Sequence, residues 1–211
     1  MKITDLRVMM LSAVIPPERR WRTDYGTMWK NDTSIVVVET DEGITGYGPA
    51  QGTPPAIKAI VENAFKPLLV GEDPTFVERL WERMYSGSRA NPALERGYSQ
   101  PIMVGRRGET IAALSGVDVA LWDILGKSVG QPIYKLLGAC RSSIRAYDSG
   151  GWASGEAAGR ELAGYVEKGY AAVKMRAVGN AGFSIPKALA RISAARKAIG
   201  DDVPIMVAAH G

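Results

Sequence analysis

Cysteine and histidine are almost absent from the sequence. Its 211 residues include one cysteine, Cys140, and one histidine, His210. A single cysteine excludes an intrachain disulfide, and such sparing use of cysteine is typical of a reducing compartment. A histidine-rich metal site, or a serine or cysteine nucleophile paired with histidine, would have to use His210 alone. These scarcities argue against the common hydrolase classes.

Long apolar runs and dense patches of one charge are also missing. No uncharged run approaches the roughly 20 residues that a membrane-spanning helix requires, and residues 1–5 do not resemble a signal peptide. We therefore expect a soluble, cytoplasmic protein without a membrane partner. The formal net charge is +4, but the cations are dispersed, and their densest group is Arg19, Arg20 and Arg22. That group is too thin to bind nucleic acid, so a small anionic substrate is the expected partner.

The composition itself is that of an ordinary globular protein, with 46% hydrophobic and 23% charged residues. In residues 1–140, β-type patterning predicts a small antiparallel sheet, and apolar residues at three- and four-residue spacing then predict helices. The expected strands cover residues 3–15, 33–40 and 44–47, and the expected helices cover 55–69, 74–85 and 110–129. Asp41, Glu42 and Gly43 supply the turn of a hairpin between the second and third strands. Residues 1–140 are therefore expected to form an α+β domain.

From residue 141 the pattern changes to an alternation of strands and helices. The expected strands cover residues 144–147, 171–176 and 204–208, and the expected helices cover 155–168 and 185–199. Such an alternation indicates parallel βα units, here two units and one further strand. A complete (βα)8 barrel needs about 250 residues. We therefore expect residues 141–211 to be the first part of a TIM-type barrel, so that the chain is truncated.

Two short glycine groups could suggest a nucleotide-binding loop. Gly46 and Gly48 flank Tyr47, and Gly150 precedes Gly151. Neither group has the spacing or the strand-to-helix context of that motif. We interpret both as turns.

One predicted strand carries two cations in an otherwise apolar run. Side chains alternate between the two faces of a strand, so Lys174 and Arg176 share one face and Met175 points to the other. Two like charges side by side are unfavourable on a packed face. They indicate either a solvated face or a site that concentrates positive charge.

The segment 113–138 reads ALSGVDVALWDILGKSVGQPIYKLLG. Its pattern predicts a buried helix, interrupted by Asp118 and Asp123 and stopped at Gly130. Asp123 stands four residues before Lys127, which is a favourable helical pair. The simplest interpretation of both aspartates is structural, as a cap or an ion-pair partner.

The same segment closely resembles the mandelate racemase/muconate-lactonizing branch of the enolase superfamily. It matches the pattern Ala-x-small-small, an acidic residue, x-Ala-Leu-x-Asp-Ile-x-Gly-Lys, a Pro-Ile pair and Leu-Leu-Gly. The resemblance implies an N-terminal capping domain over residues 1–140 and the start of a β/α barrel over residues 141–211. It also implies removal of the proton α to a carboxylate, with Mg²⁺ stabilising the enediolate, and assembly into a homo-oligomer.

The resemblance gives the two cations a role. The second barrel strand of the family ends in Lys-x-Lys or a close variant, and Lys174-Met175-Arg176 stands there. Lys174 is then similar to the residue that pairs with the substrate carboxylate. Arg176 is a poor base, because arginine stays protonated. It could hold the carboxylate or the leaving group, donate charge while a base on the opposite face removes the proton, or pair with a metal-ligand carboxylate.

The third strand departs from the family pattern. Members usually end it with Asp-x-Asn, whereas Ala208 and His210 stand at those positions. Alanine cannot bind a metal, so Mg²⁺ is expected for a full-length member but not for this chain. His210 would contact substrate in a full barrel, or it is a frayed terminal residue.

A polar, aromatic loop matches the region where the capping domain of the family closes over the barrel mouth. There Arg22 would meet an anionic substrate, Trp21 would shield the site from water, and Tyr25 would contact the substrate. The alternative is a solvated or interfacial loop.

The resemblance therefore predicts an acid-sugar dehydratase, which is a lyase. Arg176 favours this over a racemase, because racemisation needs a competent base on each face of the substrate. A racemase or cycloisomerase of the same branch remains the nearest alternative. A non-catalytic relative or fragment is the alternative of a different class, and Ala208 favours it.

Overall fold

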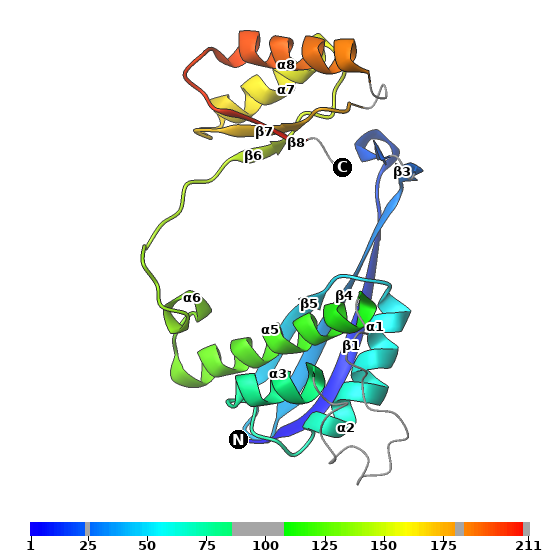
Figure 1. Cartoon of the computed structure of the whole chain (residues 1–211), viewed down its shortest axis with the longest axis vertical. Coiled ribbons are helices and arrows are strands. Elements are labelled where there is room, and N and C mark those ends of the chain that lie inside the picture. The colour runs from blue at the N-terminus through cyan, green and yellow to red at the C-terminus, as the bar shows by residue number, and fades with distance from the viewer. Residues whose placement is uncertain (24–25, 86–107, 180–183, 209–211) are drawn as a thin grey trace. The chain divides into compact units, whose positions relative to one another are not determined.

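A computed structural model describes residues 1–23, 26–85, 108–179 and 184–208, which belong to two compact units. The first unit comprises Met1–Ile15 and Lys30–Cys140, and the second comprises Pro16–Trp29 and Arg141–Gly211. Both units are drawn in Figure 1. The sequence-based division also falls between residues 140 and 141, but it placed residues 16–29 in the first domain, whereas they group with the second unit. No described helix is both long enough and apolar enough to cross a membrane.

A three-stranded antiparallel sheet forms one layer of the first unit. Its strands are β1 (Ile3–Val14), β4 (Lys30–Thr40) and β5 (Thr45–Ala50), in the order β1-β4-β5. The register pairs Val8 with Val36, and Val36 with Gly48. Gly43 joins β4 to β5 in a left-handed conformation, with φ of +77°. The predicted hairpin is confirmed.

Helices cover one face of this sheet and bury the core of the unit between the two layers (Figure 1). They are α1 (Pro54–Ile60), a π-helical turn (Val61–Phe65), α2 (Lys66–Leu69), α3 (Val77–Tyr85), α5 (Glu109–Val129) and the short α6 (Ile133–Leu136). Leu6 and Val36 from the sheet meet Phe65, Leu80 and Leu121 from the helices, and all five are fully buried. The capping-domain architecture predicted from the sequence is confirmed.

The interpretation of Gly46 and Gly48 as turn residues is wrong. Both lie inside β5, on the side against which α5 packs. A Cβ on Gly48 would overlap the carbonyl oxygen of Gly116 in α5, and a Cβ on Gly46 would lie 2.7 Å from Ile124 Cγ1. These glycines therefore allow the helix backbone to lie directly on the strand.

Asp123 and Lys127 of the segment 113–138 fasten α5 to the same strand. Asp123 Oδ2 accepts hydrogen bonds from the Tyr47 backbone N–H (2.9 Å) and from Lys127 Nζ (2.6 Å). Lys127 Nζ also donates to the Thr45 carbonyl oxygen at 2.7 Å. The predicted helical ion pair is confirmed, and its role is structural.

The second unit contains a parallel sheet in the order β6-β7-β8, from β6 (Asp148–Gly150), β7 (Val173–Arg176) and β8 (Ile205–Ala208). The helices α7 (Glu156–Glu167) and α8 (Ile185–Ile199) lie over one face of it (Figure 1). A short 3-10 turn (Pro17–Arg19) and the antiparallel ribbon of β2 (Trp21–Thr23) and β3 (Gly26–Met28) belong to the same unit. Both predicted helices and the parallel βα arrangement are confirmed.

The first predicted strand of this unit is misplaced. The sequence indicated residues 144–147, whereas β6 begins at Asp148. The four residues of β7 provide partners only for Asp148, Ser149 and Gly150. Ile144, whose apolar side chain favoured the earlier position, is 83% exposed.

Replacement of Gly48 by alanine tests the close packing of β5 on α5. The added methyl group would overlap the Gly116 carbonyl, and we expect the free energy of unfolding to fall by about 1–3 kcal/mol. Gly164 in α7 is the control, because a Cβ there meets nothing within 4 Å. Gly164→Ala should raise stability by up to about 1 kcal/mol. Denaturant unfolding measures both, and a Gly48→Ala protein as stable as the parent would refute the packing.

The effect of Asp118 on the free energy of unfolding should depend on pH, and this dependence can be tested. Burial, followed by the negative charge of Glu78, raises the pKa of this α5 carboxyl above its ordinary value. The ionised carboxylate of Asp118 therefore lowers the free energy of unfolding. This loss of stability develops as pH rises from the unfolded-state pKa through the folded-state pKa. Asp118→Asn should raise the free energy of unfolding at pH 7, and the gain should vanish below about pH 4.

Asp123→Asn is the matched control for this measurement. It removes the charge that pairs with Lys127, so it should lower the stability at pH 7. Thermal unfolding followed across the pH range compares the two variants. If Asp118→Asn destabilised the protein at pH 7, the upward shift assigned to the Asp118 pKa would be contradicted.

Candidate functional site

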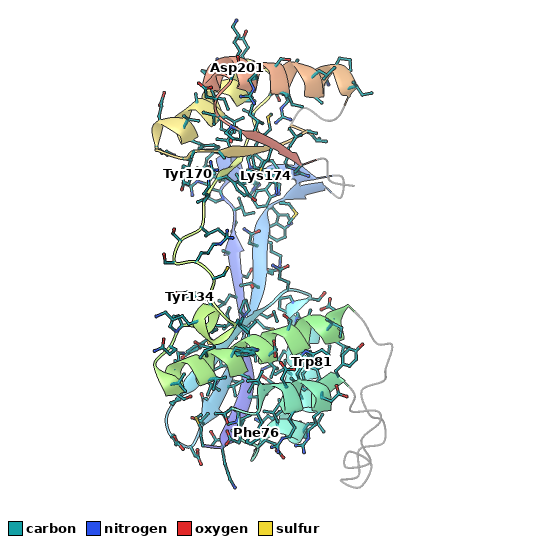
Figure 2. All side chains as sticks on the ribbon, turned by 60° about the vertical axis from the view of Figure 1, so that its left-hand side comes forward. Phe76, Trp81, Tyr134, Tyr170, Lys174 and Asp201 are labelled. Carbon is teal, nitrogen blue, oxygen red and sulfur yellow. The ribbon has the colours of Figure 1, made fainter. Side chains whose placement is uncertain are left out.

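The site is built on the alternation of side chains along β7. Val173 and Met175 are 0% and 1% exposed, and they pack with Leu162 of α7 and Ala195 of α8. Lys174 and Arg176 are half-buried on the opposite face, and Figure 2 shows Lys174 on the side of the sheet away from α8. The prediction that the two cations share one face is confirmed.

Each of the two cations lies against an aromatic ring. Arg176 Cζ is 4.9 Å from the ring centroid of Trp152, and Lys174 Nζ is 5.7 Å from that of Tyr147. Such contacts are attractive because the ring face is electron-rich. Neither cation forms an ion pair with another described residue. Their charge is therefore held in place without being neutralised there.

The guanidinium of Arg176 has an unused hydrogen-bond donor. Its Nε is buried and has no hydrogen-bond partner in the part of the chain that the structure describes. A buried donor without a partner costs about 1–3 kcal/mol, and arginine cannot lose its proton to avoid that cost. The guanidinium is planar, and its N–H groups can donate in pairs to the two oxygens of a carboxylate.

Trp21 joins the same cluster from the β2–β3 ribbon. Its ring centroid is 5.7 Å from that of Trp152, with an angle of 34° between the ring planes. Aromatic pairs at this spacing attract each other. Trp21 is thus brought together with Arg176 through Trp152.

Trp152 is placed by the backbone immediately before it. Gly151 follows β6 in a left-handed conformation, with φ of +71°. A Cβ on Gly151 would lie 2.6 Å from Met175 Cβ, so only glycine lets this loop cross so close to β7. The crossing brings the next residue, Trp152, over Arg176.

Sequence reasoning missed both Trp152 and Tyr147. The available signal for Trp152 was its place just after the first parallel strand, since loops at the C-terminal ends of strands carry the sites of barrel enzymes. Tyr147 precedes that strand, so this signal does not apply to it. The misplaced strand at 144–147 obscured that signal.

Three other predicted site residues are only partly covered by the structure. Tyr25 and His210 lie outside the described residues. Arg22 lies in β2, where its backbone pairs with Thr27, and its side chain is outside what is described. Their roles stay predictions.

The third strand does not supply a metal ligand. Ala208 ends β8 in register with Arg176, and its carbonyl oxygen accepts a hydrogen bond from the Ala177 N–H at 3.0 Å. The side chain at this position is a methyl group, which cannot bind a metal. The described residues contain no group of three or more His, Cys, Asp or Glu side chains that could hold a metal ion. These residues do not fit Mg²⁺.

Comparison with known proteins shows similarity along the whole chain. Residues 7–138 match the family described as mandelate racemase / muconate lactonizing enzyme, N-terminal domain. The chain is 38% identical over 179 residues to arabinonate dehydratase of Saccharolobus solfataricus, covering 82% of this chain and 44% of that protein. It is 36% identical over 186 residues to D-galactarolactone cycloisomerase of Agrobacterium fabrum, covering 84% and 44%.

The fold is similar to that of solved relatives. A member of the enolase superfamily from Polaromonas sp. JS666 superposes with a TM-score of 0.79 at 33% identity, covering 98% of this chain and 51% of that one. The chain thus spans about half the length of the relatives it matches. On the match over residues 7–138 and the shared fold, the chain belongs to the mandelate racemase/muconate lactonizing enzyme family of the enolase superfamily.

Proposed function

We propose that this protein is an acid-sugar dehydratase. In this reaction a base removes the proton α to a carboxylate and the β-hydroxyl leaves as water, which gives a 2-keto-3-deoxy acid. The observation that carries the proposal is Arg176, which lies over Trp152 beside Lys174 and has a buried Nε–H without a hydrogen-bond partner among the described residues. Relatives named arabinonate dehydratase and D-galactonate dehydratase support it.

The chemistry requires positive charge where the substrate becomes more anionic. When the Cα–H bond breaks, its electron pair moves toward the carboxylate and forms an enediolate, and preorganised cations stabilise that charge. Lys174 and Arg176 lie on one face of β7 and would supply two such cations. Elimination then forms the C=C bond as the C–O bond to the β-hydroxyl breaks. The leaving hydroxyl takes up a proton to become water, and the enol product tautomerises to the ketone.

Arg176 can be assigned to binding but not to proton removal. Its guanidinium stays protonated, whereas a racemase needs a competent base on each face of its substrate. Arg176 would therefore hold the carboxylate or the departing hydroxyl, and Lys174 would pair with the carboxylate. Trp21 and Trp152, whose rings lie 5.7 Å apart, would exclude water beside them.

A cycloisomerase is the second candidate function. The Agrobacterium fabrum relative with that name is 36% identical to this chain, close to the value for the dehydratase. Both reactions place an anionic substrate at the site, so the two cations suit either one. The fate of the substrate distinguishes them.

The direct test incubates the full-length protein with a panel of aldonic and aldaric acids and their lactones in the presence of Mg²⁺. We expect a product that has lost one water and gives the chemical reaction of a 2-keto-3-deoxy acid. Exchange of the α-proton for deuterium without loss of water would indicate a racemase, and lactone isomerisation a cycloisomerase. Absence of all three reactions would favour a non-catalytic relative and refute the proposal.

Substitution of Arg176 tests its assigned role. Arg176→Lys keeps a positive charge but loses the planar fork of donors, and we expect kcat/KM for the acid sugar to fall by about 10²-fold. Arg160→Lys is the matched control, because Arg160 is exposed on α7, and its kinetics should stay within about twofold of the parent. Equal kinetics for the two variants would remove Arg176 from the site.

A further inference from the structure

A buried arginine and a glutamate form hydrogen bonds with the backbone of the two segments that contain Trp152 and Arg176. Arg191 of α8 is only 3% exposed. Its guanidinium donates to four backbone carbonyl oxygens at the ends of β6 and β7. Nε donates to Ala153 at 3.0 Å, Nη1 to Arg176 and Ala177 at 2.9 Å each, and Nη2 to Gly151.

Glu161 of α7 binds the complementary groups of the same loop. Its Oε1 accepts a hydrogen bond from the Gly151 N–H at 2.8 Å, and its Oε2 accepts one from the Ala153 N–H at 3.1 Å. The residues on either side of Trp152 therefore have both backbone polar groups bound, the N–H by Glu161 and the C=O by Arg191. Tyr165 donates its hydroxyl hydrogen to Glu161 Oε1 at 2.9 Å.

Gly179 shows how closely the Arg191 side chain packs against the neighbouring backbone. A Cβ on Gly179 would lie 2.7 Å from Arg191 Nε and 2.8 Å from its Cζ. Burial is the main cause that lowers the pKa of Arg191, while the charge of Glu161 opposes this and that of Arg176 adds to it. Arginine remains protonated even so, and its guanidinium donates to the backbone carbonyl of Arg176.

We propose that Arg191 and Glu161 are positioning residues, which fix Trp152 and Arg176 in the geometry that binds the substrate carboxylate. This inference rests on the proposed function for its kinetic consequence, but its geometric content stands on the hydrogen bonds alone. Arg191 reaches the carbonyl of Arg176 itself and the carbonyls on both sides of Trp152. A change at Arg191 would therefore move both partners of the guanidinium–indole contact.

The test compares Arg191→Lys with Arg196→Lys in the full-length protein. Arg196 is the matched control, because it lies on the same helix and also donates to backbone carbonyls, those of Gly200 (2.6 Å) and Val203 (2.8 Å), ahead of β8. A lysine cannot reproduce donation from the three guanidinium nitrogens of Arg191. Both bonds of Arg196 come from Nη1, and the shorter lysine would weaken them, so both variants should lower the melting temperature. Only Arg191→Lys should also raise KM and lower kcat/KM, by about 10- to 100-fold.

Circular dichroism of the Trp21–Trp152 pair provides a readout that does not depend on activity. The contribution of the pair is the difference between the spectra of the parent protein and Trp152→Phe. We expect Arg191→Lys to lose most of that contribution and Arg196→Lys to retain it. Glu161→Gln, which replaces one acceptor oxygen by a donor, should weaken the signal in the same way, and it decides the outcome if Arg191→Lys does not fold.

The possible outcomes separate this inference from the proposed function. If the parent protein converts no acid sugar, the proposed function fails, and circular dichroism alone decides the positioning role. If the folded Arg191 and Glu161 variants keep the tryptophan signal, the positioning role is overturned whatever the enzyme does. If Arg191→Lys and Arg196→Lys change the kinetics equally, Arg191 acts on stability only and the inference is again overturned.

Discussion

The candidate site depends on the two-residue period of β7. Val173 and Met175 have to face α7 and α8, because burial of such side chains stabilises the fold by about 1.5–3 kcal/mol each. Lys174 and Arg176 are thereby forced onto the other face. A shift of one residue in the register would bury both cations against the helices, where an unpaired charge costs several kcal/mol. The packing of the second unit therefore dictates where its positive charge lies.

The segment that carries the family resemblance has a structural role and does not belong to the candidate site. Asp123 and Lys127 bind β5, and Gly116 lies against the strand where Gly48 leaves room for it. These residues let the backbone of α5 lie directly on β5. The motif that identifies the family is thus a packing device of the first unit. The chemistry is expected from residues of the second unit, where Ala208 departs from the family pattern.

The sequence predicted well those elements that depend on neighbouring residues alone. The helix at 185–199, the turn at Gly43 and the alternation at Lys174 follow from periodicity and turn chemistry, and the structure has them. The strand at 144–147 was wrong because strand bounds depend on a partner elsewhere in the chain. Gly46 and Gly48 were taken for turn residues because the sequence does not show which helix will pack on them.

The candidate site was predictable only in part, for the same reason. Lys174 and Arg176 could be found, because a pair of cations in an apolar strand is visible in the sequence. Trp152 had only its place after a strand as a signal, and Arg191 had none, because their roles depend on contacts between segments 24 and 38 residues apart. A lone tryptophan after two glycines, or an arginine within a helix, has no pattern that reveals such a contact.

The most direct measurement of the central claim is a crystal structure of the full-length protein with a sugar acid bound. The account predicts that carboxylate oxygens of the sugar lie within hydrogen-bond distance, about 3 Å, of the Arg176 guanidinium. It also predicts that the guanidinium still lies over the Trp152 ring and that Lys174 lies on the same side of β7. A sugar acid bound elsewhere, with Arg176 turned away from it, would contradict the account.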